Sequence, residues 1–520
     1  MALFSNTTTL YSGGLLLAWY IYGKIKERRE NPAGLPLPPG PKGYPIIDSL
    51  FDIPTNKPWL VYNEWTKKYG DMFYFKALGQ PFIVISSVDA AYELFERRSS
   101  NYSDRARMTM LNELMDWTWN FAFQQYGNRW RRHRRTFHDY FHPNVVDRYN
   151  DIQTEASRAF LRRLLASPDD FMLHIRHAFT TTIMKIAYGI TITDEDESGY
   201  AKTAEIALAS LAAVGNPGSF LVDLFPLMKH IPEWLPGAGF QKKASYWRYI
   251  SNLFANGPWN EVKGQLKEGT AQPSMATTLL EKLPDENSPE RADEEVTARN
   301  ACAVSFAGGA DTTVSTIQGF FMAMALYPEV QRKAQEELDR VLNGRFPEFN
   351  DRPSLPYINA MVKESMRWQL VTPLAVPHKA TEADEYNGYY IPKGTLVIGN
   401  AWAMLHDPEV YKDPMVYNPE RFLKNGEIDK SVRDPAIASF GFGRRICPGR
   451  FLADNSLFIL ISHILSVYNI SPALDKNDKE IKIIPEMTSG LLSYPEPFKC
   501  RIIARTKKAE EMIRDSELMA

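Results

Sequence analysis

One loop of this chain places a cysteine among glycines and arginines, a combination that favours a metal ligand. Residues Phe440 to Gly449 read Phe-Gly-Phe-Gly-Arg-Arg-Ile-Cys-Pro-Gly, with a single thiol at Cys447. A cysteine binds a metal as its thiolate, and iron is among the metals that accept this soft ligand. Gly443 and Gly449 have no side chain, so the backbone can approach a flat cofactor closely at both positions. The loop therefore predicts an iron site built on Cys447.

Charge and helix geometry are expected to keep this sulfur ionised. Arg444 and Arg445 precede it and supply positive charge, which stabilises a thiolate. Pro448 fixes the chain where a helix can begin, and the free amides of a helix start favour negative charge. The other cysteines, Cys302 and Cys500, lie in an apolar helical stretch and near the end of a strand-like run. Both are expected to be core residues without a chemical role.

A second motif lies inside a long helical pattern, which runs from Asp293 to Tyr327 as one predicted helix. Its middle, from 307 to 313, reads Ala-Gly-Gly-Ala-Asp-Thr-Thr. Each glycine costs about 1 kcal/mol relative to alanine in a helix interior, and threonines can bond back to the backbone. The glycines could simply allow close helix packing. Alternatively, Gly308 and Gly309 open a groove beside a cofactor, where Asp311 and Thr312 form a polar spot.

Two further motifs carry charge. Glu364 and Arg367 lie three residues apart on one helix face, and Arg421 lies in the sequence Pro-Glu-Arg-Phe. Surface pairs of this kind are common and contribute little. Basic residues from Arg129 to Arg135 surround Trp130, and a solvated helix face is the ordinary interpretation of such a run. Alone, neither motif indicates a function.

Together, the four motifs resemble the cytochrome P-450 superfamily. The pattern Phe-x-x-Gly-x-Arg-x-Cys-x-Gly is similar to that family's haem-binding loop, and the other three motifs occur in the family's order. The resemblance implies the cytochrome P-450 fold, mainly α with small β-sheets (α+β). It also implies heme b, with Cys447 as the axial iron ligand. The cofactor-binding residues that it implies in the loop are Phe440, Gly443, Arg445 and Gly449.

The resemblance assigns roles to the remaining motifs. Thr312 and Asp311 would be catalytic, with the Thr312 hydroxyl steadying iron-bound oxygen and Asp311 relaying protons from solvent. The residues that would bind the haem propionates are Trp130, Arg134, His378 and Arg445. Those of a mostly buried structural charge network would be Glu364, Arg367 and Arg421. The basic side chains left for docking an acidic electron donor are Arg131, Arg132 and Arg135.

The N-terminus predicts a membrane anchor. Residues 2–23 carry no charge and Lys24, Lys26, Arg28 and Arg29 follow, so one span with a cytosolic body is expected. Six prolines between 32 and 45 predict a stiff hinge. The expected domains are a lumenal tip and anchor at 1–23, a basic and proline-rich hinge at 24–45 and a haem-thiolate catalytic domain at 46–520, on the endoplasmic reticulum membrane. A cleaved signal peptide is disfavoured because such peptides begin with positive charge.

Composition narrows the class further. The chain has 520 residues and no internal repeat, which favours one large domain. Lys and Arg total 60 against 62 Asp and Glu, so no overall attraction to nucleic acid is expected. Three cysteines are too few for a disulfide framework, and a reducing compartment follows.

Short β runs frame a helical middle. The ranges 72–77 and 82–86 predict one hairpin, and Asn-Gly at 387–388 predicts another, followed by a strand at 395–398. Helical periodicity dominates from about residue 88 to 370. Two more strands are expected at 481–484 and 498–503.

The resemblance implies a monooxygenase that hydroxylates a lipophilic small molecule with O₂. Electrons would come from NADPH through NADPH–cytochrome P-450 reductase, with cytochrome b5 as a second donor. The sequences at 375–379 and 391–395 look like fungal enzymes of specialised metabolism, which favours a terpenoid substrate and leaves an aromatic or indole-derived one open. Two alternative functions are a haem-thiolate isomerase or dehydratase, which usually lacks the helix threonine, and a haem-based sensor, which needs no proton relay. The presence of Asp311 and Thr312 argues against both.

The substrate cavity is expected to be apolar. By the resemblance, parts of 108–123, 206–218, 304–310, 371–376 and 488–492 would line it. The hydrophobic candidates in these segments, each of which core packing would explain equally well, are Trp117, Trp119, Phe121, Phe123, Phe306 and Leu374.

Overall fold

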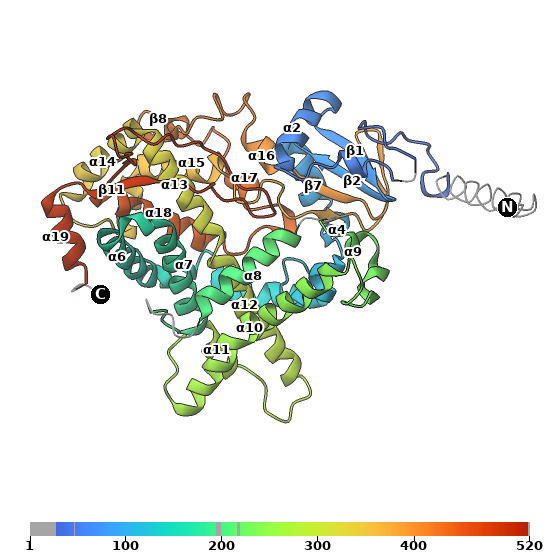
Figure 1. Ribbon diagram of the computed structural model, residues 1–520, viewed down its shortest axis with the longest axis horizontal. Helices are drawn as coiled ribbons and strands as arrows, with labels where there is room; N and C mark the ends of the chain where they lie inside the picture. Colours follow the sequence, from blue (N-terminus) through green and yellow to red (C-terminus); the bar gives the residue numbers. More distant parts are fainter. Residues whose placement is uncertain (1–27, 46, 194–198, 216–218, 518–520) are drawn as a thin grey trace, which may run out of the picture.

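The computed structural model describes residues 28–45, 47–193, 199–215 and 219–517, and Figure 1 shows their arrangement. Helices make up most of the molecule, and a small five-stranded sheet lies at one side, on the right of the view. The predicted class, mainly α with small β-sheets, is confirmed. The predicted anchor at 1–23 and the signal-peptide alternative lie outside the described residues.

The helices differ widely in length. The helices of twelve residues or more are α2 (Pro58–Tyr69), α5 (Asn128–Phe141), α6 (Asn150–Ala166), α7 (Phe171–Tyr188), α8 (Tyr200–Val214), α10 (Gly239–Glu268), α12 (Arg291–Gly309), α13 (Thr312–Leu326), α14 (Pro328–Leu342), α15 (Pro356–Trp368) and α18 (Arg450–Val467). The shorter ones are α3 (Val88–Ala91), α4 (Ser99–Tyr102), α9 (Leu221–Leu224), α11 (Met275–Glu281), α16 (Ala401–Leu405), α17 (Ala436–Ser439) and α19 (Lys507–Asp515).

Tighter or wider single turns connect these helices. They are η1 (Leu50–Asp52), η2 (Tyr92–Arg97), η3 (Thr109–Leu114), η4 (Trp117–Trp119), η5 (Val146–Tyr149), η6 (Pro168–Asp170), η7 (Pro226–His230), η8 (Phe349–Ser354), η9 (Pro419–Phe422) and η10 (Gly443–Arg445).

The main sheet has the strand order β1-β2-β7-β4-β3. Its strands are β1 (Met72–Ala77), β2 (Gln80–Ile85), β7 (Leu396–Gly399), β4 (His378–Lys379) and β3 (Asp104–Arg105). Strand β2 pairs with β7 in parallel, and the other neighbours pair antiparallel. The register sets Arg105 opposite His378, so two cationic side-chain types meet at one edge of the sheet.

Both predicted hairpins are present. The β1–β2 turn uses Leu78 and Gly79, and the turn between β5 (Asp384–Tyr386) and β6 (Tyr389–Ile391) uses Asn387 and Gly388. All four turn residues have positive φ, as a tight two-residue hairpin turn requires. The other two-stranded sheets pair β8 (Leu423–Lys424) with β9 (Glu427–Ile428) and β10 (Tyr468–Pro472) with β11 (Cys500–Ala504).

The predicted strand at 481–484 is wrong. These residues form a loop in which the Ile481 amide donates to the Ala473 carbonyl at 2.7 Å. Pro485 follows directly and cannot donate to a ladder, so the apolar run ends before regular pairing develops. The apolar pattern there reflects partial burial, since Ile484 is 59% exposed and Ile483 only 6%.

The predicted single helix over 293–327 is divided. Helix α12 ends at Gly309 and α13 begins at Thr312, while Asp311 takes a non-helical φ of −138°. The Thr312 hydroxyl donates to the Gly308 carbonyl at 2.7 Å, the oxygen that the next helical turn would use. Glycine flexibility and this back-bond together open the helix in the middle of the molecule.

Helix α18 forms part of the central core. Its apolar residues contact α6, α14 and α15, and the cluster also includes residues of α13. Within the described part of the chain it is the one helix long and apolar enough to cross a membrane. Because 67% of that stretch is buried inside the protein, we interpret α18 as a core helix.

The proline-rich segment lies against the body where it is described. The Pro36 carbonyl accepts the Tyr390 amide at 2.8 Å, and the Pro39 carbonyl accepts the Tyr74 amide at 2.9 Å. A Cβ at Gly40 would lie 1.7 Å from the Tyr74 carbonyl oxygen, so this contact requires glycine. The segment therefore extends the edge of the sheet region.

Candidate functional site

A cavity of about 330 Å³ lies between the break of α12 and α13, helix α18 and the cysteine loop. Its lining includes Cys447 and Gly449 from the loop, and Gly308 and Thr312 from the helix break. Aromatic and aliphatic side chains complete most of its surface. The cavity thus brings the two sequence motifs, more than 130 positions apart, to one space.

The loop around Cys447 is fixed by its own backbone. The Cys447 amide donates to the Phe440 carbonyl at 2.8 Å, which closes the loop behind the sulfur. Gly443 has a φ of +54°, and a Cβ there would lie 1.9 Å from the Phe95 carbonyl oxygen. Gly443 is therefore needed for a close contact with η2, and its expected role beside a flat cofactor stays a prediction. At Gly449 a Cβ would meet only the Cys447 sulfur at 4.0 Å, so that position stays open to the cavity.

The charges around the sulfur differ from the prediction. Burial raises the pKa of Cys447, while the amides of Gly449 and Arg450 and the charges of Arg134 and Arg450 lower it. The predicted helix start after Pro448 is present, since α18 begins at Arg450 and offers these amides. An iron cation bound to the sulfur would favour the thiolate further.

Arg444 and Arg445 do not supply that charge. Arg444 donates to the Tyr126 hydroxyl at 2.7 Å. Arg445 donates to the carbonyls of Ser103 at 2.7 Å and Gln124 at 2.7 Å, and it lies over the Trp130 ring at 4.4 Å. The sequence interpretation was wrong here because neighbours along a turn need not face the same way.

One wall of the cavity is cationic. Three arginines, Arg105, Arg134 and Arg445, line it, together with His378 and Trp130. Among the described residues that line the cavity, there is no Asp or Glu to balance this charge. Such a wall fits an anionic group, and arginine pairs well with carboxylates.

Arg134 is the clearest sign of a missing anion. Within the ranges that the structure describes, no hydrogen bond or ion pair holds its guanidinium. Burial lowers the pKa of Arg134 to about 10, and the nearby Cys447 sulfur offsets only part of this effect. A carboxylate of a bound cofactor would remove this penalty.

His378 and Arg105 meet through the sheet register. The His378 Nδ1–H donates to the Tyr102 carbonyl at 2.6 Å, and burial keeps the pKa of His378 well below its usual value. Arg105 donates to the carbonyls of Ala122 and Val376 at 3.1 and 2.6 Å. Sequence reasoning missed Arg105, since a lone arginine outside any recognised motif carries no pattern.

The helix break presents one open glycine and one packed glycine. A Cβ at Gly308 would meet nothing within 4 Å, whereas a Cβ at Gly309 would lie 2.6 Å from Ile183 on α7. Gly308 therefore fits the predicted groove, and Gly309 fits the alternative of close helix packing. Thr312 lines the cavity with its hydroxyl bonded to the Gly308 carbonyl.

Asp311 lies behind the break rather than on the cavity surface. Its side chain is 2% exposed and is not among the lining residues. Arg176 on α7 donates to Oδ1, and the Tyr494 hydroxyl donates to Oδ2. The Arg176 side chain is 31% exposed, so the cluster connects a buried carboxylate to solvent. Neither Arg176 nor Tyr494 was singled out from the sequence.

The structure brings Glu364, Arg367 and Arg421 together. Arg367 donates to both Glu364 oxygens at 2.7 and 2.8 Å, and Arg421 Nε donates at 3.2 Å. The three side chains are 0, 0 and 7% exposed, in that order. This is a buried network, unlike the exposed pairs that the spacing alone suggests.

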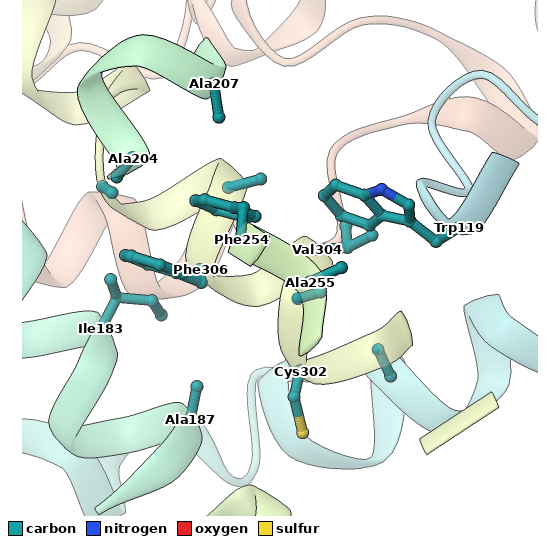
Figure 2. Packing of buried hydrophobic residues seen from close by; sticks show 14 of the residues in the cluster. Trp119, Ile183, Ala187, Ala204, Ala207, Phe254, Ala255, Cys302, Val304 and Phe306 are labelled. Carbon is teal, nitrogen blue, oxygen red and sulfur yellow. The ribbon is translucent and has the colours of Figure 1, made fainter. Parts of the chain in front are cut away.

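The aromatic candidates divide between cavity and core. Phe121 and Phe123 line the cavity, whereas Trp117, Trp119, Phe306 and Leu374 do not. Figure 2 shows two of them, Phe306 and Trp119, packed in the core. Phe254 and Phe306 stack at 4.4 Å between ring centroids, and Trp119 faces Phe254 at 5.7 Å. The core interpretation is therefore correct for these rings.

The basic run on α5 is partly neutralised. Arg132 pairs with Asp293 at 2.5 Å and donates to the Thr297 hydroxyl at 3.1 Å. Arg132 thus has a counter-ion from α12, and its part in docking an electron donor stays a prediction. Arg131 and Arg135 remain exposed on the same helix.

Comparisons with known proteins agree with this geometry. The family model of Cytochrome P-450 matches residues 38–501. Cytochrome P-450 monooxygenase COX1 of Coprinopsis cinerea is 45% identical over 98% of this chain and 99% of that protein. Cytochrome P-450 monooxygenase 98 of Postia placenta is 43% identical, over 99% and 98%. Tryptamine 4-monooxygenase of Psilocybe cyanescens is 41% identical, over 95% and 97%.

These relatives are monooxygenases by name, which favours that activity over an isomerase, dehydratase or sensor. The family implies heme b on a cysteine thiolate, and the residues present fit that group. The cavity offers one cysteine, an unbalanced cationic wall and an open glycine beside the sulfur. On sequence, cavity and relatives together, the chain belongs to the cytochrome P-450 family and is a heme-thiolate monooxygenase of fungal type.

Proposed function

We propose that this chain is a membrane-anchored monooxygenase that hydroxylates a neutral, lipophilic molecule of fungal specialised metabolism, with a terpenoid as the favoured substrate. The observation that carries the proposal is the single cavity that joins Cys447 to an apolar wall and to Thr312. The proposed reaction also requires the protein to hold the cofactor, deliver protons and select the substrate.

Cys447 would bind the iron, and heme b would then supply the reductive activation of O₂ and the transfer of one oxygen atom to carbon. Trp130, Arg134 and Arg445 would bind the propionates. His378 could join them only with Nε2 protonated, because its Nδ1–H is already committed to the Tyr102 carbonyl. A neighbouring propionate favours that charged form.

Arg105 would strengthen the same wall. Its guanidinium lies at the cavity and is buried, and burial lowers its pKa well below the usual value. A second anion near it would offset this penalty, as for Arg134. Phe440, Gly443 and Gly449 would shape the loop under the cofactor, with Gly443 acting through its contact with Phe95.

Thr312 and Asp311 would manage protons at the helix break. Thr312 lines the cavity and its hydroxyl donates to the Gly308 carbonyl, so its oxygen can accept a hydrogen bond from a water there, or the hydroxyl can leave this bond and donate into the cavity. Asp311 would pass protons inward from the Arg176 side, which reaches solvent. This assignment keeps the two residues in separate roles: Thr312 orients a proton and Asp311 supplies it.

The cavity chemistry favours a neutral substrate. Leu208, Leu211, Val304 and Leu491 contribute apolar surface, and the lining residues include no carboxylate within the described chain. Tryptamine 4-monooxygenase acts, by its name, on an amine. A protonated amine buried here would lack a counter-ion, which is costly. We therefore favour a terpenoid over an indole amine.

Electron delivery would use the exposed arginines of α5. Arg129, Arg131 and Arg135 are exposed and lie on the helix that carries Arg134 toward Cys447. A basic face of this kind attracts an acidic partner and raises its association rate. The proposed donors are an NADPH-dependent reductase and cytochrome b5.

Membrane attachment would use residues beyond the N-terminal anchor. Leu221, Phe225, Leu227 and Trp234 are 55, 47, 82 and 78% exposed in one short segment. Exposed apolar residues next to a tryptophan are typical of surfaces that enter the interfacial region of a bilayer. This supports the proposed location on the endoplasmic reticulum membrane.

The test is co-expression of the chain with a fungal NADPH–cytochrome P-450 reductase, followed by exposure to lipophilic extracts and mass analysis. We expect products heavier by one oxygen atom that require both NADPH and the reductase. A Cys447→Ser variant is the control. Product formation without the reductase, or from the serine variant, would contradict the proposal, and products only from amines would contradict the substrate class.

A further inference from the structure

Tyr494 lies in the C-terminal loop between Met487 and Pro495, whose ends form an antiparallel bridge. Its hydroxyl donates to Asp311 Oδ2, while Arg176 donates to Oδ1. Both oxygens of this buried carboxylate are thus held by side chains from other elements. One of these partners reaches solvent, and the other belongs to the loop.

The same loop forms part of the cavity wall. Leu491 and Leu492, three and two residues before Tyr494, line the cavity. The Ser493 carbonyl accepts the Ser315 hydroxyl at 2.6 Å, and the Ser493 amide donates to the Val371 carbonyl at 2.8 Å. The loop is therefore tied both to α13 and to the opposite side of the cavity.

The loop is also stiff. The Thr488 amide donates to the Tyr494 carbonyl at 2.7 Å, and the Tyr494 amide donates to the Thr488 hydroxyl at 3.0 Å. The Ser493 hydroxyl donates to the Thr488 carbonyl at 2.8 Å. Because these bonds close the loop on itself, a shift of its leucines would move Tyr494 as well.

We propose that Tyr494 is a positioning residue for Asp311, held in place by the loop that also lines the cavity. The inference rests on the proposed function, because Asp311 has a relay role only in that reaction. A hydroxyl bonded to an ionised carboxylate is a strong, directional restraint. Burial, with the nearby charge of Asp311, raises the pKa of Tyr494 well above its usual value, so the phenol remains a donor.

Loss of this hydroxyl would free one oxygen of Asp311. Arg176 would then be the remaining restraint, and it would draw the carboxylate toward solvent and away from the break of the helix. Protons would reach the cavity less often. Reduction of O₂ by two electrons to hydrogen peroxide would then increase relative to reduction by four electrons to water.

The test compares Tyr494→Phe with Tyr468→Phe. Tyr468 is a matched control: its buried hydroxyl donates to the Leu161 carbonyl at 2.7 Å, and it does not line the cavity. The assay uses the haem-loaded enzyme with reductase, NADPH and O₂, without organic substrate. One NADPH, one proton and one O₂ give one peroxide, whereas two NADPH, two protons and one O₂ give two waters.

We expect the ratio of peroxide to water to rise about tenfold in Tyr494→Phe, as loss of one hydrogen bond to a charged group implies. Tyr468→Phe should stay close to the wild type. A ratio that is unchanged or lower in Tyr494→Phe, or that rises equally in both variants, would overturn the inference.

Hydrogen exchange provides a reading that does not depend on turnover. Backbone amides from 309 to 314 should exchange faster in Tyr494→Phe than in the wild type or in Tyr468→Phe. Equal exchange in all three proteins would also overturn the inference. If the wild type is active and Tyr494→Phe does not differ from it, only this inference is overturned. If the wild type shows no reductase-dependent oxygen consumption, both the proposed function and this inference are overturned.

Discussion

Replacing Glu364 by glutamine tests the buried charge network directly. Glu364 accepts two bonds from Arg367 at 2.7 and 2.8 Å, one from Arg421 at 3.2 Å and one from the Asn418 amide at 2.8 Å. Glutamine keeps the shape but removes the negative charge. Two buried guanidinium groups then lose their counter-ion, and breaking a buried pair in this way costs about 3–5 kcal/mol.

The assay is the rate at which heated protein loses the carbon monoxide spectrum of thiolate-bound haem. If half of the cost falls on the unfolding barrier, that rate rises about 10- to 70-fold, because 1.36 kcal/mol corresponds to one factor of ten. The control is Lys333→Met, which removes an exposed pair with Glu420 and should cost about 0–1 kcal/mol. Glu364→Gln decaying no faster than Lys333→Met would refute the role of the network.

Three further predictions concern single residues. Thr312→Ala should keep its haem but divert NADPH electrons to peroxide, and unchanged coupling between NADPH use and product would contradict the role of its hydroxyl. Gly443→Ala should yield far less haem-loaded protein than Gly441→Ala. Both glycines have positive φ, but only at Gly443 would a Cβ lie 1.9 Å from the Phe95 carbonyl oxygen. Equal yields of the two variants would be evidence against this contact. Burial lowers the pKa of His463 to about 4, below an unfolded value of about 6.5, so acid favours the unfolded state. As the pH falls from about 6.5 to about 4, the free energy of unfolding should therefore decrease by about 1.36 kcal/mol per pH unit. A His463→Gln variant with the same slope would exclude the contribution of His463.

The sequence predicted those parts of the fold that depend on local patterns. Asn387 and Gly388 adopt the positive φ values that a tight hairpin needs, and Pro448 precedes a helix start. The division of α12 from α13 was missed, because the decisive contact is a hydroxyl bonding back to Gly308. The sequence showed that two glycines destabilise the helix, but it did not show where the helix breaks.

Site residues were predictable where a motif fixed their spacing. Cys447 and Thr312 face one cavity, as the resemblance implied. The partners of Asp311 were not predictable, since Arg176 and Tyr494 come from distant elements and belong to no motif. Arg105 likewise reaches the cavity only through strand register.

The charges around the sulfur show the same limit. Arg444 and Arg445 are its neighbours in sequence, yet they donate to Tyr126 and to backbone carbonyls. Arg134, from α5, faces it instead. Sequence proximity singled out Cys447 as the candidate ligand but not the groups that set its charge.

The carbon monoxide difference spectrum of the reduced protein tests the central claim most directly. Wild-type protein should show the strongly red-shifted band of haem bound by a thiolate, because Cys447 provides the sulfur ligand. Cys447→Ser should lose that band even where haem remains bound. An identical spectrum from the serine variant, or wild-type protein that binds no haem, would contradict the assignment of Cys447 as the iron ligand.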